Sequence, residues 1–249
     1  MVNLVYCELL KLRRSKMVLI SFLGALTTPV MLTVEGVKKY YWEPEADITL
    51  AGFYNGSFLY TMLLFGLIVY AVFAAYLFSR EHTEKTLKTI LTVPVSKTSF
   101  ILSKFVTLFI WIMALTVISW AGMFLLAAIY GALFEISAFS LAVAAGYLGK
   151  MLFGGALMFF TLTPIVFIAL WTKNVVAPII ATAAIVMVNV ALSNEALGAL
   201  FPWTSTYLWV EGRLEETGFP YPVAIGLIAL VSILGFLASV LYFQREDVN

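Results

Sequence analysis

The chain has 249 residues, of which 62% are hydrophobic and 12% are charged, whereas soluble domains contain about 25% charged and roughly 45–50% apolar residues. A soluble fold of this size has too little interior for so much apolar surface, so the composition excludes a soluble domain and predicts a protein of the lipid bilayer. The net charge of +1 gives no reason to expect a nucleic-acid partner, and the single cysteine, Cys7, excludes an intrachain disulfide framework.

The chain begins with a basic segment, residues 1–16, which is followed by an apolar run from Met17 to Val34. A cleaved signal peptide is one interpretation of this pattern. The run is, however, long enough to cross a bilayer core, and no clear small-x-small cleavage site follows it. We therefore predict a retained first span.

Six apolar runs approach the roughly 20 residues that a transmembrane helix needs. Segment 136–149 is apolar but short, so it either extends the fourth span or lies in the interface before it. Strands with alternating polarity, which are typical of membrane barrels, are absent. We predict an all-α polytopic membrane protein with one transmembrane domain over residues 1–249 and spans at 17–34, 56–78, 105–130, 151–171, 175–192 and 223–243.

Lys and Arg residues are unevenly distributed between the two sides that six spans define. With the N-terminus inside, eleven of them lie in inside segments, and four lie outside, namely Lys38, Lys39, Lys150 and Arg213. Because basic loops stay in the cytoplasm, we predict that both termini are cytoplasmic. The polar insert, residues 79–99, is then cytoplasmic too.

The polar insert has the pattern of a short amphipathic helix. Thr83 is a suitable cap for its start, and Pro94 ends it because proline lacks a backbone donor. Ser96 is a suitable cap for the next helix, which leads into the third span. Three apolar residues at i, i+3 and i+4 share one face and two lysines flank it: Leu87, Ile90 and Leu91, with Lys85 and Lys88.

A helix this short is unstable alone, so its apolar face must pack against another surface. The anionic bilayer surface suits its basic flanks. A groove on a partner protein suits its apolar face equally well. The residue pattern by itself leaves both interpretations open.

The outside segment 193–222 is rich in aromatic residues, among them Trp203 and Trp209. An aromatic belt at the membrane interface is the main interpretation, and contact with an amphiphilic ligand is the alternative. Lys150 has two interpretations as well. Its side chain either extends to the interface from near a helix end or contacts the substrate.

Motifs for bond chemistry are absent from the sequence. Residues 144–151 end like a phosphate-binding loop, but Ala144 replaces the first glycine and Met151 replaces the hydroxyl that binds Mg²⁺. His82 is the only histidine, which excludes histidine-based triads. The spans carry almost no ionisable residue, which argues against an ion-coupled secondary transporter. We expect a chain that is not an enzyme and binds no cofactor or metal.

The polar insert resembles a loop of one membrane-protein family. It is similar to the segment after the second span in permease subunits of ABC-type exporters of the polysaccharide, drug and lantibiotic-immunity kind. The start from Tyr6 to Lys16, the charged tail after Tyr242 and the length of 249 residues resemble the bacitracin and lantibiotic-immunity permeases in particular. Lys85 departs from the family pattern, which commonly has glycine there. The matching pattern is Glu81-x4-Thr86-Leu87-x2-Ile90-Leu91-x2-Pro94-Val95-Ser96-Lys97, followed by Lys104.

This resemblance implies that the insert is a coupling helix that docks on a separate cytoplasmic ATPase. It implies two permease subunits, identical or similar, with two copies of the ATP-binding subunit, which alone binds ATP and Mg²⁺. The implied function is export of an amphiphilic molecule from a bacterial cell membrane, with a bacitracin-like or lantibiotic-like peptide as first choice. Such export would confer antibiotic resistance.

The resemblance also implies roles for individual residues. Residues 1–16 would form a leader on the inner membrane surface, with Val5, Leu9 and Leu12 facing the lipid. Its polar residues would be Glu8, Lys11, Arg13 and Arg14. Coupling to the ATPase would involve Glu81, Lys85, Thr86, Leu87, Lys88, Ile90, Leu91, Pro94, Ser96 and Lys97.

Two other functions remain compatible with the sequence. One is a membrane scaffold or sensor that transports nothing and docks a cytoplasmic partner through the insert. The other is a six-span secondary transporter, which would work without an ATPase.

We expect Leu87→Asp to leave the spans inserted but to uncouple the ATPase, because a carboxylate in the apolar face prevents that face from packing. Export and ATP hydrolysis, measured together in membranes that contain both subunits, check this expectation. Normal transport by the variant would show that the docking face is wrongly assigned.

Overall fold

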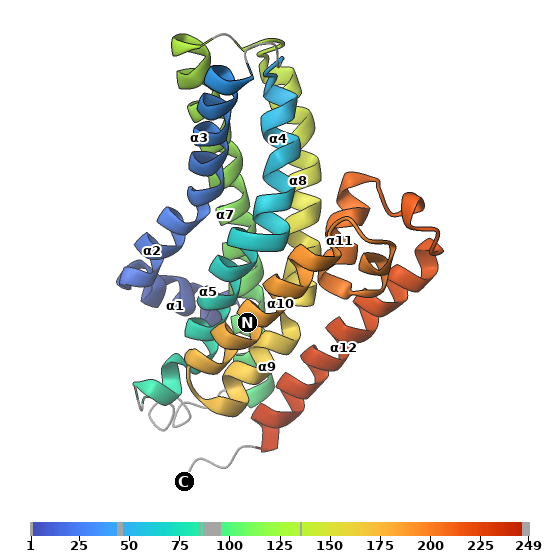
Figure 1. Cartoon of the computed structure of the whole chain (residues 1–249). Coiled ribbons are helices and arrows are strands. Elements are labelled where there is room, and N and C mark those ends of the chain that lie inside the picture. Colours follow the sequence, from blue (N-terminus) through green and yellow to red (C-terminus); the bar gives the residue numbers. More distant parts are fainter. Residues whose placement is uncertain (1, 44–46, 85, 87–95, 135, 246–249) are drawn as a thin grey trace.

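The computed structural model describes residues 2–43, 47–84, 86, 96–134 and 136–245 (Figure 1). Within these ranges the regular elements are helices, and an isolated bridge joins Thr49 to Ser137. The expected all-α architecture is therefore confirmed for this part of the chain. The helices are α1 (Val2–Arg13), α2 (Lys16–Ala25), α3 (Thr27–Trp42), α4 (Leu50–Phe58), η1 (Leu59–Leu64), α5 (Phe65–Thr83), α7 (Lys97–Leu133), α8 (Leu141–Thr161), α9 (Thr163–Thr172), α10 (Val176–Leu192), η2 (Ala196–Leu200), α11 (Pro202–Glu211), η3 (Glu215–Thr217) and α12 (Tyr221–Arg245).

Five helical stretches in the described residues are long and apolar enough to cross a bilayer, and they contain five of the six predicted spans. The remaining predicted span, 175–192, corresponds to α10, an apolar helix of 17 residues. Its length of about 26 Å is shorter than a hydrocarbon core of about 30 Å. The five long stretches are Lys16–Trp42, Leu50–Thr83, Lys97–Leu133, Leu141–Thr172 and Tyr221–Arg245.

Three of the long stretches are interrupted, the first of them at Leu26 between α2 and α3. Between α4 and α5 lies η1, a π-helix, which has a wider turn than an α-helix. Gly66 follows η1, where a Cβ atom would collide with the carbonyl oxygen of Thr61. Between α8 and α9 the break precedes Pro164, which has no backbone N–H to continue the helix.

The structure decides the role of segment 136–149, because α8 begins at Leu141. Ser140 caps it by accepting a hydrogen bond of 3.2 Å from the backbone N–H of Val143. Residues 141–149 therefore extend the fourth span, and residues 136–140 precede it. Lys150 lies in the middle of α8, so the interpretation that places it near a helix end is wrong.

The aromatic segment 193–222 folds back onto the bundle. In α11 the residues from Thr204 to Leu208 are all buried. The Thr204 hydroxyl donates to the Asn189 side-chain oxygen at 3.0 Å, and the Asn189 amide donates to the carbonyl oxygen of Leu63 at 3.3 Å. These bonds join α11 and α10 to the π-helix of the second span.

Figure 1 shows α3, α4, α7 and α8 side by side in the upper half of the molecule. The shorter α10 and α11 lie beside the middle, and α12 runs from there to the lower end near the C-terminus. The end of α5 and the start of α7 are also at this lower end. The polar insert therefore leaves and rejoins the bundle on the side where α12 ends.

Close packing of α12 on α9 requires a glycine. A Cβ atom at Gly235 would collide with the backbone at Thr163 and Pro164, whereas one at Gly226, on the same helix, would meet open space. We expect Gly235→Ala to lower the free energy of unfolding by about 1–3 kcal/mol, the usual cost of overpacking. Thermal unfolding of the purified chain checks this, with Gly226→Ala as the matched control. Equal melting temperatures for the two variants would contradict the packing argument.

Candidate functional site

The predicted coupling residues are only partly within the described chain. Lys85, Leu87, Lys88, Ile90, Leu91 and Pro94 lie outside the described residues. Glu81 lies in α5, Thr86 follows it, and Ser96 and Lys97 begin α7. Thr83, the expected cap of a new helix, is instead the last residue of α5, and its hydroxyl donates to the carbonyl oxygens of Ser79 and Arg80. That expectation is wrong.

The start of α7 is fixed to the end of α12. Ser96 caps α7 by accepting a hydrogen bond of 3.1 Å from the N–H of Ser99, as expected. The Lys97 ammonium donates to the carbonyl oxygen of Gln244 at 3.3 Å, and the Gln244 amide donates to the Thr98 hydroxyl at 2.9 Å. The end of the polar insert is thereby joined to the C-terminal helix.

Glu81 lies at the centre of a group of buried charges. Its carboxylate is 2.6 Å from the Lys104 ammonium, 3.5 Å from the Arg80 guanidinium and 3.6 Å from the Lys11 ammonium. The side chain of Glu81 is 3% exposed. It therefore offers no surface to a docking partner, and any part it has in coupling passes through these cations.

Glu8 of α1 contacts the same three cations. Its carboxylate is 2.7 Å from Lys11 and 3.3 Å from both Arg80 and Lys104. The five residues Glu8, Lys11, Arg80, Glu81 and Lys104 form what we call the ion network. It joins α1, the end of α5 and the beginning of α7.

Because most of its charges are buried, the ion network needs every partner in place. Glu8 and Lys104 are each 2% exposed, and Lys104 also donates to the carbonyl oxygen of Leu77 at 2.7 Å. Removing a charge from water costs several kcal/mol unless partners compensate for it. The four buried side chains of the network are therefore stable only while the three helices stay together.

The ion network changes the expected orientation of the leader. Leu12, expected to face lipid, is 1% exposed and belongs to the hydrophobic core, so that expectation is wrong. Glu8 lies one turn earlier on the same buried face. Arg13 and Arg14 are exposed. The leader is thus packed into the bundle through one face and open to its surroundings on the other.

Sequence reasoning named four members of the ion network but did not bring them together. Arg80 was missed as a member. The available signal was local: Glu8 and Lys11 have the spacing of a helical ion pair, and Lys104 is a lone cation in an apolar run. The separations along the chain, 72 residues between Glu8 and Arg80 and 96 between Glu8 and Lys104, place the remaining pairs beyond any local pattern.

The structure brings two of the three candidate substrate contacts to neighbouring positions. Trp209 packs edge-on against Phe153, with ring centroids 5.3 Å apart, and Phe153 lies one turn after Lys150 on α8. Burial raises the pKa of the Glu211 carboxyl above its ordinary value, although the positive charges of Lys150 and Arg213 lower it in part. Trp203 lies at the other end of α11, and its indole nitrogen is buried without a hydrogen-bond partner among the described residues.

The fold and the charge pattern define a polytopic helical membrane protein whose polar insert is held at both ends by its own bundle. Comparison with known proteins identifies the class. The family described as "ABC-2 family transporter protein" matches residues 4–189, and the chain belongs to this family. It is therefore an integral membrane permease subunit of an ABC transporter, in a family that works with an ATP-binding partner.

A curated relative supports this assignment over nearly its full length. The chain is 38% identical over 209 residues to the bacitracin transport permease protein BCRB of Bacillus licheniformis. The similarity covers 83% of this chain and 97% of that relative. The family match, from residue 4 to residue 189, includes α5, α7 and most of α1, which carry the ion network.

We expect Glu81→Gln to lower the free energy of unfolding by about 3–5 kcal/mol, because it leaves the three cations of the network, two of them buried, with the single carboxylate of Glu8. The matched control is Glu84→Gln, three residues on, where the side chain is exposed. Thermal unfolding of the two purified variants beside the parent chain measures the difference. A Glu81→Gln chain as stable as the control would show that the ion network contributes nothing to folding.

Proposed function

We propose that the chain is the six-span permease subunit of an exporter that removes bacitracin or a similar amphiphilic peptide antibiotic from a bacterial cell membrane. The observation that carries this proposal is the 38% identity to a bacitracin transport permease over 97% of that relative. Export of this kind would protect the cell from the antibiotic.

Contacts between the chain ends support six crossings. Glu8, near the N-terminus, pairs with Lys104 at the start of α7, and Lys97 bonds to Gln244 at the end of α12. These contacts support a common side for both ends of the chain and hence an even number of crossings, with α10 as the proposed sixth span. The excess of Lys and Arg on this side supports a cytoplasmic location for both termini.

The proposed mechanism assigns the polar insert to the partner ATPase. Two ATP-binding subunits, which carry ATP and Mg²⁺, would drive two permease subunits between two arrangements by a rigid-body motion. The insert, residues 79–99, would receive this motion as a short coupling helix. Its two ends pass directly into the ion network and the α7–α12 contact, which would distribute the motion to the bundle.

The proposed substrate region lies on the other side, around α8 and α11. Lys150, Trp203 and Trp209 would offer one positive charge and two aromatic surfaces to an amphiphile. The partly buried carboxyl of Glu211 interacts with the charge of Lys150. This interaction supports a charged group in a mostly apolar substrate region.

Reconstitution tests the proposed function. Proteoliposomes with the permease and its ATP-binding subunit should hydrolyse ATP faster when bacitracin is added. A coupled substrate would shift the permease toward the conformation in which the ATP-binding subunits hydrolyse ATP. A nonpeptide detergent of similar charge serves as the control ligand. Stimulation by no amphiphile would favour a scaffold or sensor, and bacitracin movement without the ATP-binding subunit would favour a secondary transporter.

A further inference from the structure

A cavity of about 520 Å³ opens beside the ion network, between the junction of α1 and α2 and the end of α5. Its lining residues are the cations Lys11, Arg14 and Arg80, the carboxylates Glu81 and Glu84, and the hydroxyl residues Ser15, Tyr76 and Thr86. The cavity therefore combines the two kinds of donor that recognise phosphate oxygens, namely charged nitrogen and neutral hydroxyl.

The charges around the cavity do not balance. The ion network has three cations and two carboxylates, so one positive charge is left over among its five members. Arg14 adds a further positive charge, which the exposed carboxylate of Glu84 offsets. The four buried members, Glu8, Arg80, Glu81 and Lys104, balance one another, so the excess positive charge lies on the partly exposed Lys11 at the edge of the cavity. An anion in the cavity would pair with this charge.

The hydroxyl groups are already oriented in the cavity. Ser15 donates to the Tyr76 oxygen at 2.9 Å, which leaves the Tyr76 proton available for an acceptor. The Arg80 guanidinium lies over the Tyr76 ring, 5.6 Å from its centroid. Ser15 also caps α2, whose N-terminus carries a partial positive charge. These groups converge from α1, α2 and α5.

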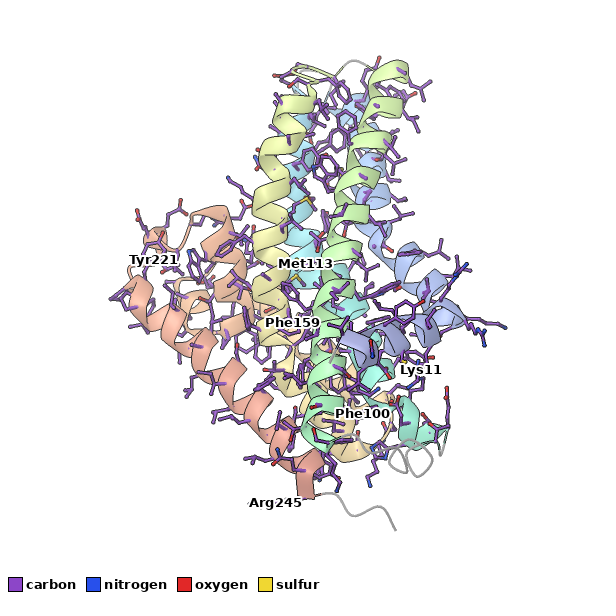
Figure 2. The ribbon with its side chains drawn as sticks, turned by 180° about the vertical axis from the view of Figure 1, so that it is seen from behind. Lys11, Phe100, Met113, Phe159, Tyr221 and Arg245 are labelled. Carbon is purple, nitrogen blue, oxygen red and sulfur yellow. The ribbon has the colours of Figure 1, made fainter. Side chains whose placement is uncertain are left out.

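The surroundings favour a lipid as the source of the anion. Directly after Ser15, α2 exposes three large apolar side chains, Leu19, Ile20 and Leu23. Figure 2 shows Lys11 toward the edge of the molecule, below the level of Met113 and above that of Arg245. A lipid whose acyl chains pack against α2 would therefore have its headgroup at the level of the cavity.

We propose that this cavity binds the phosphate group of an anionic phospholipid in the leaflet that faces the leader. Basic pockets between membrane helices bind anionic headgroups of this kind. The bound phosphate compensates the excess charge of the ion network, so the lipid stabilises the junction of α1, α5 and α7. The leader is then a lipid-dependent part of the bundle.

The test measures lipid binding to the purified full-length chain by native mass spectrometry, with phosphatidylglycerol and zwitterionic phosphatidylcholine as probes. Arg14→Gln removes one cation from the cavity, whereas Arg13→Gln removes a neighbouring exposed cation that does not line it. We expect Arg14→Gln to weaken phosphatidylglycerol binding about fivefold, the effect of one basic residue at an anionic surface. Arg13→Gln should bind it as the parent chain does, and phosphatidylcholine should bind more weakly to all three.

Tyr76→Phe provides a second variant, which keeps the ring beneath Arg80 and removes the hydroxyl. It should also weaken phosphatidylglycerol binding. Equal binding of phosphatidylglycerol to the Arg14 and Arg13 variants would overturn the proposed site. Displacement of the lipid by millimolar inorganic phosphate would assign the cavity to a soluble phosphate instead and overturn the lipid proposal.

Discussion

Two carboxylates and three cations meet where α1, α5 and α7 converge, and four of these five side chains are almost completely removed from water. Such charges are stable inside a protein only with their partners in place. The three helices therefore depend on one another at this point. An apolar contact would tolerate sliding, because it has no direction, whereas ion pairs of 2.6 to 3.6 Å fix which residues meet.

The second span is fixed at two points, one at its polar end and one within its apolar length. At one end Arg80 and Glu81 enter the ion network. Farther along, the carbonyl oxygen of Leu63 accepts a hydrogen bond from Asn189. Because Leu63 belongs to the π-helix, this bond joins the most irregular part of the span to α10 and, through Thr204, to α11. The polar insert and the aromatic segment 193–222 are thus connected through one membrane span.

Much of the fold could be predicted because apolar runs and charge distribution are local properties. The five long spans, the Ser96 cap and the excess of positive charge at one end follow from the types of residues and their spacing. Expectations that depended on how one segment packs against another were less secure. Leu12 has the character of a lipid-facing residue, but it packs against the core. Lys150 has the character of a terminal cation, but α8 begins nine residues before it.

The sequence by itself determined that the chain belongs in a membrane and where its long helices lie, because a bilayer imposes its length rule on each segment separately. Only the tertiary structure decided that Glu8, Arg80 and Lys104 form one network, that the leader is part of the bundle and that a basic cavity lies beside it. These features depend on the positions of side chains from distant segments. Hydrophobic patterning selects the face of a helix that is buried, but it does not specify which charge meets which.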